Sequence, residues 1–165
     1  DPSKYPKLQS IHLHTNGTLW NESNWVRMKN VHKFVKSCEI SVDASCKDTY
    51  ENKTRLGGKW DKLMSNLEYI SNIPTLKNVT LSFVVQNDNY TEMIDFYDLA
   101  GKIFGGKNKQ WSVFYNRVVN WGHWSKQKFE SVDVGNPDHP EFNKLMDIYK
   151  QLPLVNNIRH NLTII

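Results

Sequence analysis

The sequence predicts an α/β fold: a parallel β-sheet with helices packed on it, in about four β/α units. Short segments in which Ile and Val alternate with polar residues are typical of strands, and longer segments between them place apolar residues at helical spacing. Because strands and helices alternate along the chain, the strands should run parallel with right-handed crossovers. The 165 residues suffice for one domain with a core.

The first β/α unit follows a polar lead-in. The alternation in Ser10 to His14 predicts a strand, and Asn16-Gly17 after it is a strong turn signal. Asn21 to Ser23 can cap a helix. The apolar side of that helix is expected to hold Trp25, Met28, Val31, His32 and Val35.

The second strand, Cys38 to Asp43, ends with a hydroxyl on Ser41 and a carboxylate on Asp43. A polar turn with Arg55 follows, and Gly57-Gly58 breaks the chain before the next helix. Ligands of parallel α/β sheets bind at the carboxyl ends of the strands, so these side chains lie where chemistry is expected. The alternative is that Asp43 only caps the following turn.

The middle of the chain repeats this pattern. An amphipathic helix should run from Trp60 to Pro74, a strand from Val79 to Val85, a helix from Met93 to Gly105-Gly106, and a strand from Trp111 to Val119.

The remainder is expected to be less regular. An aromatic loop at Asn120 to Ser125 and a second loop at Val132 to Pro140 precede a helix from Phe142 to Leu152. Asn161 to Ile165 reads as a short strand or a frayed tail. We therefore expect one domain, 1–165, with its core at about 11–119 and a C-terminal loop and helix at 120–165.

Composition limits the partners and cofactors. The net charge of +4 is low and dispersed, so no nucleic acid is expected. No apolar run could span a membrane or serve as a signal peptide, which predicts a soluble, cytoplasmic protein without a membrane partner. On the same grounds, the Asn-x-Ser/Thr sequons are taken as chance matches.

Metal and catalytic motifs are not found. Two cysteines, Cys38 and Cys46, are too few for a disulfide framework or a zinc site. His12 and His14 lie on one side of a strand, but the histidines lack metal-ligand spacing. No metal ligand and no catalytic residue is assigned.

A family resemblance rests on four passages. The pattern ISVDA…TYE…R.GG.WD.L..NL begins at Ile40, TNG ends the first strand, VVQ..N..E runs from Val84 to Glu92, and V.NWG..S follows the fourth strand. Together they resemble radical S-adenosylmethionine (SAM) enzymes, in particular the branch that matures peptides and cofactors. The resemblance spans about Ile11 to Leu152 and corresponds to the third to sixth strands of a partial (β/α)₆ barrel. It therefore implies that the four β/α units form a fragment of a TIM-like (β/α) barrel.

The resemblance implies a cofactor site. Thr15, Asn16 and Gly17 would border the pocket, Ser41 and Asp43 would face SAM, and Val118 and Val119 would approach the adenine. The family's [4Fe–4S] cluster needs three cysteines in a CxxxCxxC loop, so the cluster is expected in the parent protein and not in this chain.

Two functions follow as expectations. The chain would be a truncated or excised fragment of a radical SAM enzyme, contributing part of the SAM and substrate pocket and inactive alone. Its partner would be a second copy, as a homodimer, or the missing N-terminal half of the barrel. The alternative is a non-catalytic α/β module that binds a nucleotide-like ligand or a partner chain.

Overall fold

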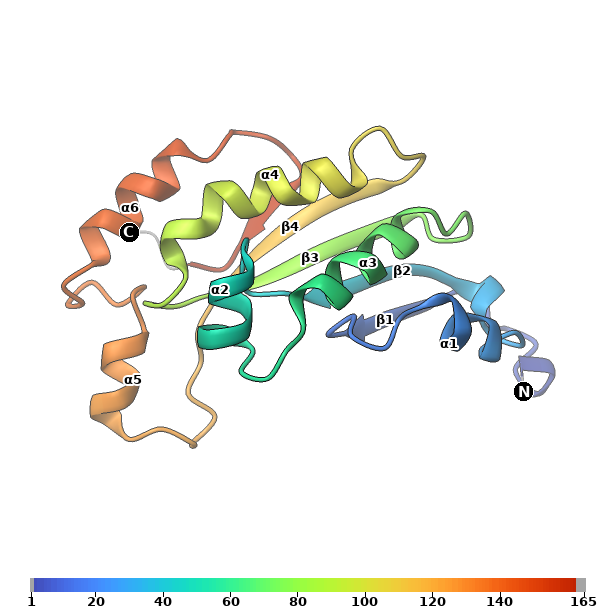
Figure 1. Ribbon diagram of the computed structural model, residues 1–165, viewed down its shortest axis with the longest axis horizontal. Helices are drawn as coiled ribbons and strands as arrows, with labels where there is room; N and C mark the ends of the chain where they lie inside the picture. Colours follow the sequence, from blue (N-terminus) through green and yellow to red (C-terminus); the bar gives the residue numbers. More distant parts are fainter. Residues whose placement is uncertain (1, 163–165) are drawn as a thin grey trace.

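The structure, a computed structural model that describes residues 2–162, is an α/β protein built on one all-parallel sheet (Figure 1). Its strands lie side by side in chain order, β1-β2-β3-β4-β5. They are β1 (Ile11–Thr15), β2 (Val35–Ser41), β3 (Asn78–Val85), β4 (Gln110–Arg117) and β5 (Ile158–His160). Such sequential order is typical of a barrel, whereas a doubly wound sheet changes direction partway along the chain.

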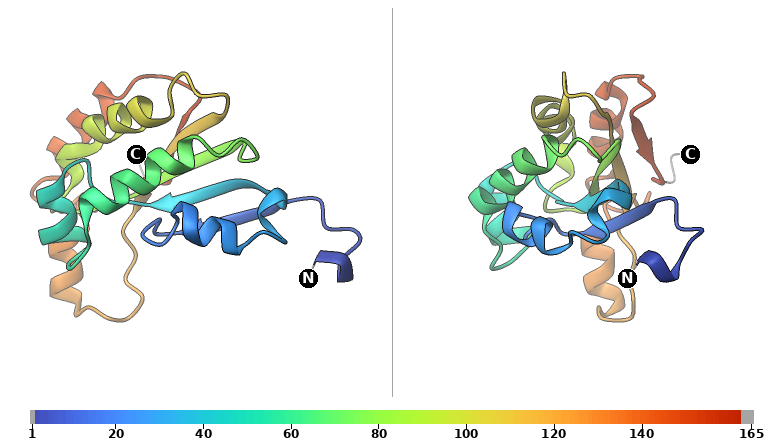
Figure 2. Two further views of the ribbon diagram at one scale, coloured as in Figure 1. Left: turned by 45° about the vertical axis from the view of Figure 1, so that its right-hand side comes forward. Right: turned by 90° about the vertical axis from the view of Figure 1, so that its right-hand side faces the viewer.

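Helices connect successive strands. They are α1 (Glu22–Arg27), α2 (Lys47–Thr49), α3 (Trp60–Ser71), α4 (Met93–Phe104), α5 (Lys126–Val132) and α6 (Phe142–Gln151). Three 3₁₀ turns, Pro2–Lys4, His32–Phe34 and Tyr90–Glu92, and a π turn, Tyr50–Thr54, complete the described structure. Figure 2 shows α3 and α4 beside the sheet, and α5 extending away from it.

One face of the sheet forms the core against these helices. The strand residues on this face, such as Ile40, Leu81 and Tyr115, are fully buried. Phe83 of β3 and Phe96 of α4 pack with ring centroids 4.8 Å apart. Burial of such side chains stabilises the fold by about 1.5–3 kcal/mol each.

The opposite face of the sheet is polar. Side chains on neighbouring strands are joined there by hydrogen bonds between His12 and Ser37 (2.7 Å), Thr80 and Ser112 (2.9 Å), and Asn116 and Ser82 (2.8 Å). Val84 and Phe114 also lie on this face, which is therefore more polar than the core face and carries fewer apolar side chains.

The structure corrects the first helix of the sequence analysis. We expected Val35 on its apolar side, but α1 ends at Arg27 and Val35 begins β2. Val35 is fully buried and lies opposite Ile11 of β1, so strand pairing determines its conformation.

Three further parts of the chain differ from expectation. The polar turn after the second strand contains α2 and the π turn, and α5 lies where only loops were expected. The last strand, Ile158–His160, ends directly before Asn161, where the tail was expected to begin. Residues 163–165 of that tail lie outside the described part.

The two edges of the sheet are different. β1 pairs only with β2 among residues 2–162, whereas β5 covers the far side of β4. The final strand therefore does not cover the β1 edge. Over the same residues, no helix is both long and apolar enough to cross a bilayer.

Gly17 brings the turn after β1 close to the core. Its φ is +72°, and a Cβ there would lie 3.0 Å from both Ile40 Cγ2 and Leu63 Cδ1. Its carbonyl oxygen accepts a 2.8 Å hydrogen bond from the buried amide of Asn66 on α3. Only glycine fits both the left-handed backbone and the contact with β2 and α3.

We expect Gly17→Ala to lower the free energy of unfolding by about 2–3 kcal/mol, because left-handed strain of about 1–2 kcal/mol adds to displacement of Ile40 or Leu63. Gly57→Ala is the matched control, since Gly57 has φ +79° and nothing within 4 Å of the added Cβ. It should cost only the strain. Equal losses in urea denaturation would contradict the close-packing argument.

Candidate functional site

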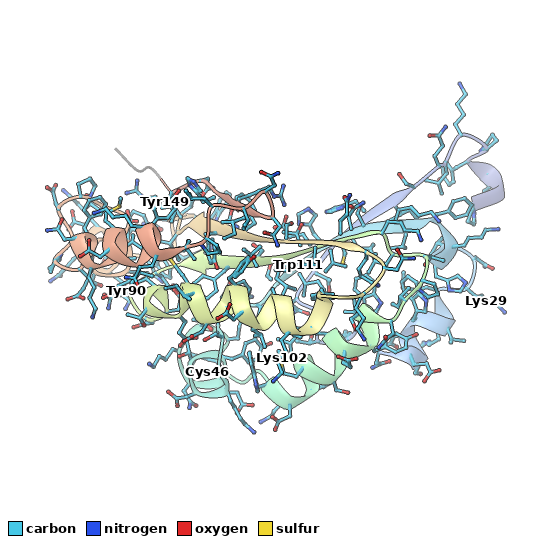
Figure 3. All side chains as sticks on the ribbon, turned by 90° about the horizontal axis from the view of Figure 1, so that it is seen from above. Lys29, Cys46, Tyr90, Lys102, Trp111 and Tyr149 are labelled. Carbon is cyan, nitrogen blue, oxygen red and sulfur yellow. The ribbon has the colours of Figure 1, made fainter. Side chains whose placement is uncertain are left out.

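The residues predicted from sequence gather at the carboxyl end of the sheet. Thr15 and Ser41 end β1 and β2, Asp43 follows two residues later, and Val118 comes directly after β4. In Figure 3 the labelled Cys46 and Tyr90 mark this end of the molecule, opposite Lys29. Parallel strands place these loops together, as in other α/β ligand sites.

Asp43 is the most constrained of these residues. Its φ is +64°, the only positive value among the described non-glycine residues, and 6% of the residue is exposed. One carboxylate oxygen accepts a hydrogen bond from Arg55 Nη2, and the other accepts one from the Val84 backbone N–H at 2.8 Å. The side chain thus joins the ends of β2 and β3 and fixes the position of Arg55.

Opposing effects act on the pKa of Asp43, and Arg55 keeps donors that this pair does not use. Burial raises the pKa of the Asp43 carboxyl above its usual value, while Arg55 and the Val84 N–H lower it. The Arg55 side chain is 33% exposed. Its buried Nε has no hydrogen-bond partner within the described residues. An anion at this guanidinium would meet donors that Asp43 does not use.

Asn89 completes the turn around Asp43. It is fully buried, and its Nδ2 donates 2.9 Å hydrogen bonds to the carbonyl oxygens of both Asp43 and Val84. Its Oδ1 accepts from the Gln86 N–H at 2.9 Å. A single side chain therefore satisfies three backbone groups at the ends of two strands, which buried backbone requires.

Glu92 anchors the next part of the loop after β2. Its Oε2 accepts hydrogen bonds from the backbone N–H and hydroxyl of Ser45, at 2.6 and 2.9 Å. Its Oε1 accepts from the Thr49 hydroxyl, with the Cys46 sulfur 3.7 Å away. Asn89 and Glu92 were not assigned to the site from sequence, although both belong to the VVQ..N..E passage.

The Thr15-Asn16-Gly17 turn uses its polar side chains locally. Thr15 Oγ1 accepts from the Gly17 N–H at 3.1 Å, and Asn16 Oδ1 accepts from the N–H and hydroxyl of Thr18. These bonds account for the three residues as an ordinary strand-to-helix turn. They also place that turn at the same end of the sheet as Asp43.

The remaining predicted residues are a hydroxyl and two valines. Ser41 is half-buried and lies opposite Ser82 on the polar face of the sheet. Val118 is 5% exposed, whereas Val119 is 54% exposed. Ser41 and Val119 are thus accessible to a ligand, whereas Val118 is buried.

The two cysteines and the histidines of β1 differ in their surroundings. Cys38 is buried beneath the helices, which raises its pKa to about 12, whereas Cys46 is exposed. No group of three or more His, Cys, Asp or Glu in the described part of the chain is arranged to hold a metal ion. His12 contacts Ser37, and His14 lies 4.0 Å from Glu39.

No protein-family model matches this chain, and no curated protein was found to be similar to it. The radical SAM resemblance therefore rests on the sequence pattern alone, and the site is defined by its geometry.

Replacing Asn89 tests whether it supports the Asp43 turn. We expect Asn89→Ala to lower the free energy of unfolding by about 2–4 kcal/mol, because it leaves buried backbone groups without partners. Asn87→Ala is the matched control: Asn87 is exposed two residues earlier in the same loop, so its loss should stay within about 0.5 kcal/mol. Similar losses for both variants, measured by urea denaturation, would contradict this role.

Proposed function

We propose that this chain forms one side of a SAM-binding pocket in a radical SAM-type barrel. The observation that carries the proposal is the Asp43–Arg55 pair at the carboxyl end of β2, two residues after Ser41. The sequential parallel sheet supports it, because this order is that of a barrel segment.

Three side chains, those of Ser41, Arg55 and Val119, suit different parts of SAM. Ser41 can exchange hydrogen bonds with ribose hydroxyls, and Arg55 can bind the methionine carboxylate. Asp43 is buried and accepts hydrogen bonds from Arg55 and Val84. We therefore propose that it positions Arg55 and does not contact SAM directly. Val119, exposed after β4, offers an apolar surface for the adenine ring.

The donors present do not fit an iron–sulfur cluster. Three thiolates are needed, and this chain has two cysteines, of which one is buried with a strongly raised pKa. The cluster and the chemistry that it would supply are therefore assigned to another part of the complete barrel. The role of this chain is to bind and orient SAM.

S-adenosylhomocysteine tests the pocket by titration calorimetry. We expect weak binding, with a Kd above about 0.1 mM, because part of the pocket is missing. Ser41→Ala and Arg55→Gln should weaken it further, whereas Asp88→Asn, at an exposed position after β3, should not. Tight binding that all three variants retain would show that the site lies elsewhere.

The open edge and the polar face favour a partner chain, as in the alternative of a non-catalytic module. The β1 strand is unpaired on one side within residues 2–162, and Ile11 to Thr15 contain no Lys, Glu or Pro of the kind that blocks edge pairing. We propose that a second copy covers this edge when the rest of the barrel is absent.

Sedimentation velocity at micromolar concentration tests this assembly. We expect a homodimer, and we expect His14→Lys to shift it toward monomer, because lysine on an edge strand opposes pairing. The introduced ammonium would lie beside Glu39, as His14 does, so the strand should keep its fold. A wild-type monomer at all concentrations would contradict the proposal.

A further inference from the structure

The amino end of the sheet has a charge pattern of its own. The segments that lead into β1 to β4 contain Lys or Arg and no Asp or Glu; these are residues 4–10, 28–34, 72–77 and 105–109. The basic residue at β5 is Arg159, within the strand itself. The long loops at the carboxyl end, 42–59 and 118–141, contain both signs. Figure 3 shows the labelled Lys29 at this basic end, away from Cys46 and Tyr90.

Two adjoining hollows lie among these basic residues. One has a volume of about 580 Å³ and extends from the start of β3 to Arg159, and the other, of about 560 Å³, includes Lys77 and Lys107. They share the residues Asn78, Lys109 and Gln110, and neither has a carboxylate in its lining. Cations and side-chain amides without acidic residues are the lining that binds anions.

Two of the cations are held in place by the fold. Lys109 Nζ donates to the carbonyl oxygens of Ile70 (3.3 Å) and Ile73 (3.1 Å), at the end of α3. Arg159 Nη2 donates to Thr80 Oγ1 at 3.2 Å, and its guanidinium lies 5.1 Å from the centre of the Phe114 ring. A cation at a helix C-terminus is stabilising in itself, which is sufficient to explain Lys109 alone.

The helix terminus does not explain the other cations. Lys107 Nζ lies 3.4 Å from Glu68, and within residues 2–162 this is the one ion pair that these hollows' cations form. Burial lowers the pKa of Lys109, and the positive charges of Lys107 and Lys77 lower it further. The cluster thus repels itself, and a bound anion would relieve that repulsion.

We propose that the two hollows form a binding site for a chain of phosphate groups, such as inorganic polyphosphate or the phosphates of a nucleotide. An extended anion is favoured over a single phosphate because the cations follow the starts of three neighbouring strands, from Lys77 to Lys109 to Arg159. Asn78 and Gln110 lie between them and supply neutral donors. The site is at the opposite end of the sheet from Asp43 and is independent of the SAM proposal.

Titration calorimetry with sodium tripolyphosphate at about 0.1 M salt is the test, with orthophosphate and ATP as comparisons. We expect tripolyphosphate to bind, and Lys77→Gln/Lys107→Gln to weaken it by about tenfold or more. ATP binding as well as tripolyphosphate would identify the phosphate chain as the recognised group. Orthophosphate should bind much more weakly than either.

The control variant is Lys126→Gln/Lys128→Gln, which makes the same change in net charge on exposed positions of α5, at the carboxyl end. It should change the affinity less than about twofold, because the charges removed lie beyond a Debye length of about 10 Å at 0.1 M salt. An equal loss of affinity in both variants would show that net charge alone explains the binding, and would overturn the proposed site. Failure of tripolyphosphate to bind would overturn it as well.

Discussion

The buried carboxylate of Asp43 needs hydrogen-bond donors, and several elements at the carboxyl end of the sheet supply them. An unpaired charge in this position would cost several kcal/mol, so its oxygens need donors. They come from the π turn's exit at Arg55 and from the last residues of β3 at Val84. Asn89 then satisfies the carbonyl that the left-handed turn exposes. The loop after β2 is consequently fastened to the loop after β3.

The two faces of the sheet differ in the chemistry of their side chains. The face under α3 and α4 carries the aliphatic and aromatic side chains that stabilise the fold. The other face carries hydroxyls, amides and the guanidinium of Arg159, joined across strands by hydrogen bonds. Such a face can meet water or a polar partner at little cost, which suits one side of a larger pocket.

The sequence predicted the sheet and its connections well, because Val and Ile alternation and helical spacing report directly on burial. It missed α5 because Lys126 to Val132 has few apolar residues, and its capping by Ser125 is a local signal. Val35 was assigned to a helix because spacing alone cannot show that it pairs with Ile11.

For the site, Asp43 and Arg55 could be found at the carboxyl end of a predicted strand. The contact of Asp43 with Asn89 joins residues far apart in sequence, which no local pattern reveals. The sequence shows that a carboxylate accepts hydrogen bonds and that an amide both donates and accepts them, but it does not show which residue is the partner. The basic hollows were missed for the same reason, since Lys77, Lys107, Lys109 and Arg159 come from three separate segments and appear dispersed until the strands align them.

The order β1-β2-β3-β4-β5 also has a consequence for how the chain acquires its structure. Each strand pairs with the strand before it, so no pairing requires a segment that has yet to be synthesised. Closing one β/α unit at a time keeps the sequence separation of contacts moderate, which favours faster folding than a sheet of distant partners. We expect the sheet to grow strand by strand from its N-terminal edge during translation, with each new helix covering the strand just added.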